Sequence, residues 1–164
     1  MQNQFRVELE KEQLIFSAAH FITFADADGN VICEQLHGHN YRVRCTVAGS
    51  LNEHGYVVDF IALRDTLAKL VGELDHQMII ATKHPTIVVT ADEREVRLTF
   101  EDRRWIFPRT DCVLLPIANT TAELMAGYLS DRLVESGILT ENVSGFILGI
   151  DENEGQWGEC ERTM

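Results

Sequence analysis

Leu36-His37-Gly38-His39-Asn40-Tyr41 decides how this chain folds, because it leads without a break into the alternating run Tyr41-Arg42-Val43-Arg44-Cys45-Thr46-Val47. The alternation of polar and apolar residues predicts one β-strand that begins with two histidines. Residues i and i+2 of a strand point to the same face, so His37 and His39 present their imidazoles side by side. Another strand-like run, Phe16-Ser17-Ala18-Ala19-His20, ends in a third histidine.

Three histidines without a fourth protein ligand are typical of a catalytic zinc site, in which one coordination position stays open for water or substrate. A structural zinc would want four protein ligands, usually with paired cysteines, and the chain contains no C-x-x-C motif. We therefore predict that His20, His37 and His39 bind zinc, although iron or another divalent metal could occupy the same ligands. Cys33, four residues before His37, is then free to act as a base or nucleophile.

The composition indicates one globular domain with no nucleic-acid partner. The chain has 164 residues, of which 45% are hydrophobic, and this is enough to bury a core. The net charge of -12 argues against nucleic acid, because phosphate binding needs a basic face. No apolar run has the length of a membrane span, and four scattered cysteines favour free thiols over a disulfide framework. We therefore expect a cytoplasmic protein with no membrane partner.

The periodicity of the whole chain predicts an α+β layout in the order β-β-α, a β-hairpin insertion, and then α-β. Asp59 is a plausible N-cap for the first helix, whose apolar residues follow helical spacing. Expected strands cover residues 6–20, 41–47 and 146–152, with a continuation at 155–160, and expected helices cover 60–74 and 120–135.

An insertion at about 83–115 is the least familiar part of the predicted domain, which spans residues 1–164. Three short β-like runs, at 86–90, 96–100 and 105–107, predict hairpins there. The charged stretches between these runs are compatible with a lid, a packing arm between subunits or a docking surface.

Five motifs occur in one order along the chain: F-S-A-A-H at 16–20, C-E-Q-L-H-G-H-N-Y at 33–41, V-V-D-F at 57–60, L-D-H at 74–76 and T-A-E at 121–123. In this order they resemble the 6-pyruvoyl-tetrahydropterin synthase and 6-carboxytetrahydropterin synthase family. The resemblance implies the tunnelling fold (T-fold), a four-stranded antiparallel sheet with two helices on one face. It also implies a homo-oligomer, commonly a hexamer of two trimers, with active sites at subunit interfaces.

The resemblance also implies roles for single residues. By motif position, the three histidines resemble the zinc ligands of the family. Cys33, Asp75 and His76 resemble its catalytic group, in which a thiolate takes a proton and a carboxylate orients an imidazole that shuttles the proton.

The pterin-binding residues follow from the same resemblance. Glu152, in the final strand, resembles the carboxylate that anchors the ring by accepting hydrogen bonds from the 2-amino group and a ring N–H. Thr121 and Glu123 resemble residues that line the pterin pocket. Asp151 is the alternative anchor, and it would face the opposite side of the strand.

The short spacing between Cys33 and His37 favours one branch of the family. It is similar to the 6-carboxytetrahydropterin synthases of the queuosine route, whereas the pyruvoyl synthases of biopterin synthesis usually carry a longer spacer. We therefore predict a zinc-dependent lyase that converts 7,8-dihydroneopterin triphosphate into 6-carboxy-5,6,7,8-tetrahydropterin. The alternative activity is 6-pyruvoyl-tetrahydropterin synthase, and a third hypothesis is a pterin- or zinc-binding protein without catalysis.

Some of these residues also have purely structural explanations. Thr120-x-x-Glu123 has the pattern of a capping box, which would occupy the Glu123 carboxylate at the start of a helix. Asp75 and His76 could close the preceding helix, because a positive imidazole is favoured at a helix C-terminus. That second role is compatible with catalysis.

Overall fold

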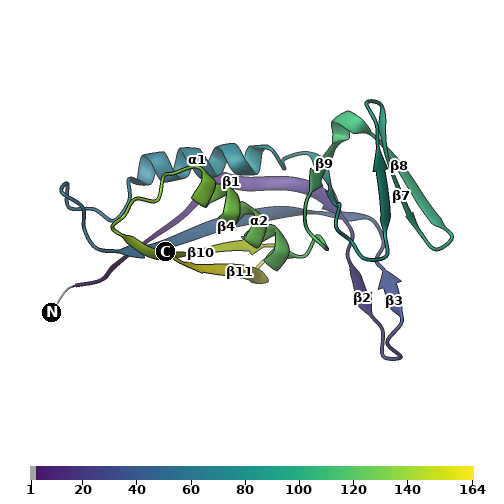
Figure 1. Cartoon of the computed structure of the whole chain (residues 1–164), viewed down its shortest axis with the longest axis horizontal. Helices are drawn as coiled ribbons and strands as arrows, with labels where there is room; N and C mark the ends of the chain where they lie inside the picture. The colour runs from purple at the N-terminus through teal and green to yellow at the C-terminus, as the bar shows by residue number, and fades with distance from the viewer. Residues whose placement is uncertain (1–2) are drawn as a thin grey trace.

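A six-stranded sheet forms the body of the protein in the computed structural model, which describes residues 3–164 (Figure 1). Four strands pair antiparallel in the spatial order β11 (Trp157–Thr163), β10 (Val143–Asp151), β4 (His37–Gly49) and β1 (Phe5–His20). Two short strands, β5 (Gln77–Ala81) and β9 (Cys112–Leu115), extend the sheet beyond β1 in parallel pairing. The α+β prediction is confirmed, but the sheet is mixed and two strands wider than predicted.

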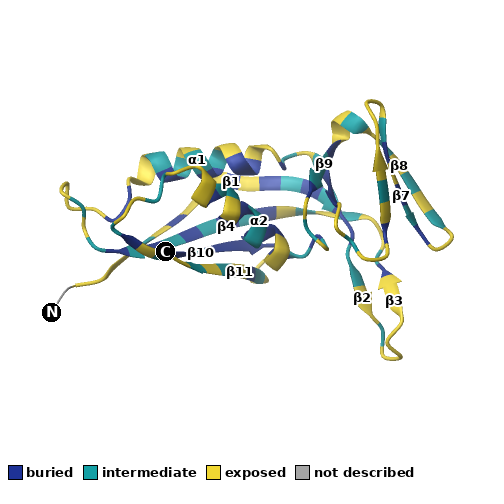
Figure 2. Cartoon of the chain, in the orientation of Figure 1, coloured by how far each residue is buried: buried dark blue, intermediate teal, exposed yellow. Residues whose placement is uncertain are grey.

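Both helices cover one face of this sheet. Helix α1 (Phe60–Gly72) packs on β1, and helix α2 (Ala122–Glu135) packs on β10 and β11. The inward side chains of the long strands close a single apolar core with them, seen as dark blue bands in Figure 2. Asp59 caps α1 as predicted, because its carboxylate accepts hydrogen bonds from two backbone N–H groups of the first turn.

No helix among residues 3–164 combines the length and the apolar character needed to cross a membrane.

An irregularity in β1 decides which of its side chains face the helices. Between Glu10 and Ile15, β1 advances by five residues while its partner β4 advances by two. This odd offset of three residues moves every later side chain of β1 to the other face of the sheet. Leu9 is buried before the offset, and the even-numbered residues from Leu14 to His20 are buried after it. The irregularity therefore places His20 under the helices.

The chain between β5 and β9 forms a separate antiparallel sheet. It consists of β6 (Val88–Ala91), β7 (Glu95–Phe100) and β8 (Arg103–Pro108), followed by the 3-10 turn η1 (Arg109–Asp111). In Figure 1 this sheet stands at one end of the main sheet, beside the hairpin of β2 (Thr23–Ala25) and β3 (Val31–Cys33). The β-like runs that the sequence predicts in this segment are present as these three strands.

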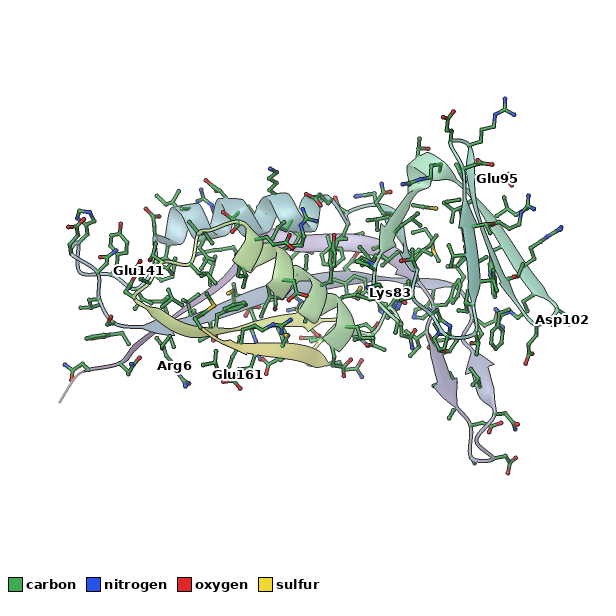
Figure 3. All side chains as sticks on the ribbon, in the orientation of Figure 1. Arg6, Lys83, Glu95, Asp102, Glu141 and Glu161 are labelled. Carbon is green, nitrogen blue, oxygen red and sulfur yellow. The ribbon has the colours of Figure 1, made fainter. Side chains whose placement is uncertain are left out.

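A second apolar cluster joins the three-stranded sheet to the rest of the chain. Its buried members are Phe21, Cys33, Met78, Ile80, Ile87, Val96, Leu98, Phe100 and Cys112. Glu95 and Asp102, by contrast, project away from the main sheet (Figure 3). The segment therefore packs on its own chain through a core, and deleting residues 91–104 would remove part of that core.

Candidate functional site

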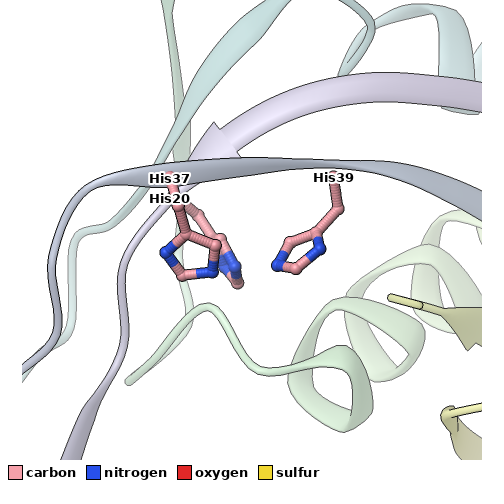
Figure 4. Close-up of side chains that lie close together, drawn as sticks. All are labelled: His20, His37 and His39. Carbon is pink, nitrogen blue, oxygen red and sulfur yellow. The ribbon is translucent and has the colours of Figure 1, made fainter.

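Three imidazoles meet on the helix-covered side of the sheet, where the ends of β1 and β4 pair. His20 lies directly opposite His37 in the strand register, and His39 follows two residues later on the same face. One ring nitrogen from each of the three lies within 4.8 Å of the others. Figure 4 shows the three rings together below the β4 ribbon. The structure thus brings together all three predicted metal ligands.

Backbone carbonyls fix the orientation of two of the rings. Nδ1 of His20 lies 2.9 Å from the carbonyl oxygen of Thr120, and Nδ1 of His37 lies 2.8 Å from that of Gln35. A carbonyl can only accept, so both Nδ1 atoms donate their protons. In the neutral imidazole this leaves a lone pair on Nε2, which is the arrangement found in metal-binding histidines.

Electron-rich atoms converge at the centre of this cluster. The buried Nε2 atoms of His20 and His39 have no hydrogen-bond partner among the described residues. Oε1 of Glu152 lies 3.0 Å from Nε2 of His20 and 3.7 Å from Nε2 of His39. Contact with the His20 imidazole lowers the pKa of Glu152, and burial lowers the pKa of His39. Neutral imidazoles facing a carboxylate are satisfied by a cation between them, so these residues fit a divalent metal.

A cavity of about 510 Å³ adjoins this cluster. Its lining includes Thr121, Glu123 and Glu152, the three residues predicted to bind the pterin ring, together with Gln156 and Trp157, which the sequence did not single out. The volume lies within the range of small-molecule sites. Because Glu152 also contacts His20, one carboxylate borders both the histidine cluster and the cavity.

The capping box predicted for helix α2 is wrong by one residue. Thr121 is the N-cap, and its side chain accepts a hydrogen bond from the backbone N–H of Leu124. Thr120 is instead buried, and its hydroxyl donates to the carbonyl of Phe21. Glu123 therefore sits one position too early to close a capping box, and its carboxylate stays available to the cavity.

Close packing of β11 against α2 shapes the same cavity. A Cβ atom on Gly158 would lie 2.6 Å from Cβ of Ala122 and 2.7 Å from the backbone nitrogen of Glu123. Only glycine lets the start of α2 approach the strand this closely. The position of Thr121 and Glu123 relative to Glu152 thus depends on this contact.

Asp151, the alternative anchor, is occupied within the fold. It is only 2% exposed, and its Oδ1 accepts a hydrogen bond from the backbone N–H of Gln156. Its Oδ2 lies 3.6 Å from Nε of Arg42. Of the two adjacent carboxylates, Glu152 is the one that borders the cavity.

Asp75 and His76 form a dyad in the turn between α1 and β5, next to β1. Nδ1 of His76 lies 2.9 Å from Oδ2 of Asp75, while Oδ1 of Asp75 accepts the backbone N–H of Ser17 at 2.8 Å. The Ser17 N–H is the largest influence lowering the pKa of Asp75, followed by the hydrogen bond with His76. His76 has a φ angle of 58°, which is uncommon for a residue with a side chain. The imidazole is 81% exposed.

The dyad makes no direct contact with the histidine cluster. Asp75 is held by the backbone N–H of Ser17, and no hydrogen bond, ion pair or ring contact joins His76 to His20, His37 or His39 among the described residues. A cavity of about 560 Å³ is lined by His76 together with Ser17, His39 and Asn40. The dyad therefore borders the histidine pair of its own chain without contacting its rings.

Cys33 is held in the second apolar cluster rather than among the histidines. It is buried, and its Sγ lies 3.7 Å from the carbonyl oxygen of Glu34. Burial raises the pKa of the thiol, and the charge of Arg103 opposes this. A catalytic role for Cys33 stays a prediction.

Glu34 is a residue that the sequence reasoning missed. Its Oε2 lies 3.8 Å from Nδ1 of His37, and its side chain is partly exposed. Its position in the sequence, between Cys33 and the histidine pair, could have marked it as a candidate site residue. A carboxylate next to the metal ligands is a second candidate for the base.

Arg103 of β8 connects the three-stranded sheet to this part of the site. Its two Nη atoms donate to the carbonyls of Cys33 and Glu34 at 2.6 and 3.1 Å. The guanidinium lies over the ring of Trp105, which in turn stacks on Phe21. These contacts hold in place the segment around Cys33 and Glu34, which precedes the histidine pair.

Comparisons with known proteins agree with the geometry. The model of the 6-pyruvoyl tetrahydropterin synthase family matches residues 8–163. A relative from Pyrococcus abyssi, which carries the provisional name 6-carboxy-5,6,7,8-tetrahydropterin synthase, is 31% identical over 149 residues, covering 91% of this chain and 87% of the relative. A relative from Methanocaldococcus jannaschii with the same provisional name is 30% identical over 154 residues, covering 91% of this chain and 90% of its own.

Solved structures give the same result. The crystal structure of 6-pyruvoyl tetrahydropterin synthase from Plasmodium vivax has a TM-score of 0.89 and 28% identity, covering 99% of this chain and 100% of that chain. Another structure of that enzyme, with a TM-score of 0.89 and 27% identity over 99% and 100% of the two chains, is described as a catalytic residue mutant in which a glutamate is replaced by alanine. The chain therefore belongs to the 6-pyruvoyl tetrahydropterin synthase family and has its tunnelling fold.

Proposed function

We propose that this chain is a zinc-dependent lyase that converts 7,8-dihydroneopterin triphosphate and one water molecule into 6-carboxy-5,6,7,8-tetrahydropterin, acetaldehyde and triphosphate. The names of the relatives from Pyrococcus abyssi and Methanocaldococcus jannaschii support this product. The observation that carries the proposal is the meeting of three imidazoles with a cavity bordered by Glu152, Thr121 and Glu123. This reaction would place the enzyme in the queuosine route and in the cytoplasm.

His20, His37 and His39 would hold the zinc ion. The carbonyls of Thr120 and Gln35 orient two of the rings so that Nε2 faces the centre of the cluster. A bound zinc ion would supply Lewis-acid stabilisation of the negative charge that develops on a side-chain oxygen when a neighbouring C–H proton leaves.

Glu152 would orient the substrate. A glutamate carboxylate is ionised at neutral pH, so Glu152 can accept hydrogen bonds from the 2-amino group and a ring N–H of the pterin. Thr121 and Glu123 would complete the pocket from the start of α2. Because Glu152 also borders the histidine cluster, a ring held there would direct its side chain to the metal ligands.

A second copy of the chain would complete the site. Asp75 orients the exposed imidazole of His76 through a hydrogen bond, as a proton-transfer pair requires. This pair makes no contact with the rings of the histidine cluster in its own chain among the described residues, so we assign it to the cluster of a neighbouring subunit. The proposal therefore includes a homo-oligomer, with the hexamer of two trimers as the expected form.

Cys33 and Glu34 are the two candidates for the base that removes the C–H proton. The sequence resemblance supports Cys33, but burial and a raised pKa disfavour its thiolate. Glu34 has a partly exposed carboxylate beside His37, and a glutamate is described as a catalytic residue in the Plasmodium vivax enzyme. Cys33→Ala and Glu34→Gln separate the two, because loss of the base lowers kcat by roughly 10²- to 10⁴-fold while loss of the other residue does not.

The experiment that tests the function is incubation of the purified, zinc-loaded chain with 7,8-dihydroneopterin triphosphate, followed by mass spectrometry of the pterin products. We expect a 6-carboxy product together with acetaldehyde. A 6-pyruvoyl product with an intact three-carbon side chain would instead identify the alternative activity, which the name of the Plasmodium vivax neighbour favours. Zinc binding without turnover of any dihydropterin would leave the third hypothesis, a non-catalytic binding protein.

A further inference from the structure

A buried hydroxyl without a partner lies at the floor of the histidine cluster. Tyr41 is 0% exposed, and its hydroxyl has no hydrogen-bond partner among the described residues. Its ring stacks on Phe16 and lies 5.4 Å from the ring of His39 and 5.8 Å from that of His20, measured between centroids. Burial of an unpaired hydroxyl is unfavourable, and a phenylalanine would fill the same space without that cost.

The strand register places Glu152 next to this hydroxyl. Tyr41 is the next inward residue after His39 on β4, and Asp151 of β10 pairs with Arg42. Continuing this antiparallel register by one step, just beyond the end of β10, brings Glu152 toward Tyr41, and Oε1 of Glu152 lies 3.7 Å from Nε2 of His39. A phenol is protonated at neutral pH and an ionised carboxylate can only accept, so Tyr41 would be the donor in a hydrogen bond between the two.

We propose that Tyr41 is a positioning residue for Glu152: its hydroxyl donates a hydrogen bond to the carboxylate in the substrate-bound site and fixes it between the histidine cluster and the pterin cavity. This inference rests on the proposed function, because it assigns Tyr41 to the anchoring of the pterin ring. It gives a role to a polar atom at a fully buried position, between the apolar core and the rings of His20 and His39.

The variant Tyr41→Phe removes one oxygen atom and keeps the ring. We expect a Tm that is unchanged or higher, because an unpaired polar atom disappears, and an unchanged zinc content. We expect binding of neopterin, which has the pterin ring but no triphosphate, to weaken by roughly tenfold, the loss expected for a hydrogen bond to a charged group. Tyr128→Phe is the matched control: its hydroxyl accepts from Nη1 of Arg132 at 2.7 Å, away from the site, and neopterin binding should stay normal.

A double-mutant cycle shows whether Tyr41 acts through Glu152. In the background of Glu152→Ala, the variant Tyr41→Phe should have no further effect on neopterin binding. An equal loss in both backgrounds would overturn the inference, and so would normal neopterin binding by Tyr41→Phe. A clear fall in Tm would also overturn it, because the hydroxyl would then have a structural partner. If the wild-type protein binds neopterin but forms no product, the proposed lyase activity is contradicted. The double-mutant cycle still tests the role of Tyr41, because it measures binding and not turnover.

Discussion

Oε1 of Glu152 lies 3.0 Å from Nε2 of His20, so a single carboxylate at the end of β10 links the histidine cluster to the pterin cavity. The contact joins residues that are far apart in the sequence and depends on the pairing of β1, β4 and β10. In the proposed function, metal binding and substrate orientation are therefore coupled through one side chain.

Zinc binding should depend on the histidine cluster and on pH. His39→Ala should lose stoichiometric zinc, measured by elemental analysis after dialysis, whereas His54→Ala, an exposed loop variant, should keep it. Histidine binds metal only when neutral, so affinity should fall as pH drops below about 6.5, where protons compete for the ligands. The lowered pKa of His39 keeps that ring neutral further into acid.

The same pH dependence should appear in stability. Zinc bound to the folded chain alone raises the free energy of unfolding by about 4 kcal/mol at a free concentration a thousand times its Kd. The difference in Tm between zinc-loaded and chelator-treated protein should be largest above about pH 6.5 and shrink below it. A difference that stays constant down to pH 5 would contradict ligation by histidines.

Glu152→Gln should weaken pterin binding. The variant removes the charge that strengthens two hydrogen bonds to the ring, and a loss of about 1.5–3 kcal/mol corresponds to roughly 10- to 150-fold in Kd. Glu154→Gln changes an exposed carboxylate in the adjacent turn and should bind neopterin normally. Titration by pterin fluorescence compares the two, and equal binding would remove Glu152 as the anchor.

Gly158→Ala should raise the KM for 7,8-dihydroneopterin triphosphate without loss of zinc. The added Cβ meets Ala122 and the backbone of Glu123 at less than 3 Å, so the start of α2 must move away from Glu152. Gly127→Ala is the matched control, because its Cβ meets nothing within 4 Å and alanine favours a helix. Steady-state kinetics on both variants decide the question, and a normal KM for Gly158→Ala would show that the pocket does not depend on this contact.

Arg103→Met should loosen the segment that carries Cys33 and Glu34. Two hydrogen bonds to their carbonyls are lost, while the length of the side chain is nearly kept. Hydrogen exchange by mass spectrometry should become faster at Glu34, whose amide donates to the carbonyl of Ile22. Arg104→Met, an exposed change at the neighbouring position of β8, should leave exchange there unchanged. Equal exchange in both variants would deny Arg103 this role.

Much of this architecture follows from local patterns. Alternation predicts β4 and the shared face of His37 and His39, and helical spacing after Asp59 predicts α1. Local rules could not place His20, because the three-residue offset in β1 depends on pairing with β4 and reverses the face of every later side chain. The sequence analysis did not predict the parallel strands β5 and β9 for the same reason. They have only five and four residues, and they join the sheet through partners that are distant in the sequence.

The candidate site was partly within reach of the sequence. The residues predicted for the metal and the pterin converge, because they lie on paired strands and at the start of α2. The sequence allowed Glu123 either a capping role or a role in the pterin pocket. Thr120 instead bonds to the carbonyl of Phe21, so Thr121 becomes the N-cap and the predicted capping box does not form. The environment of Cys33 depends on the second apolar cluster, which no spacing reveals. The position of Asp75 and His76 likewise depends on tertiary structure, because the backbone of β1 holds Asp75.

The central claim is that the histidine cluster of one chain and the dyad of another act on one substrate. The most direct test mixes two inactive variants, His39→Ala and His76→Ala, which are unfolded and refolded together with zinc and then assayed with 7,8-dihydroneopterin triphosphate. Shared sites predict that the mixture forms product although neither variant does alone, with about a quarter of the wild-type activity for random pairing of equal amounts. A mixture as inactive as its components, although it forms mixed oligomers by native mass spectrometry, would contradict the account.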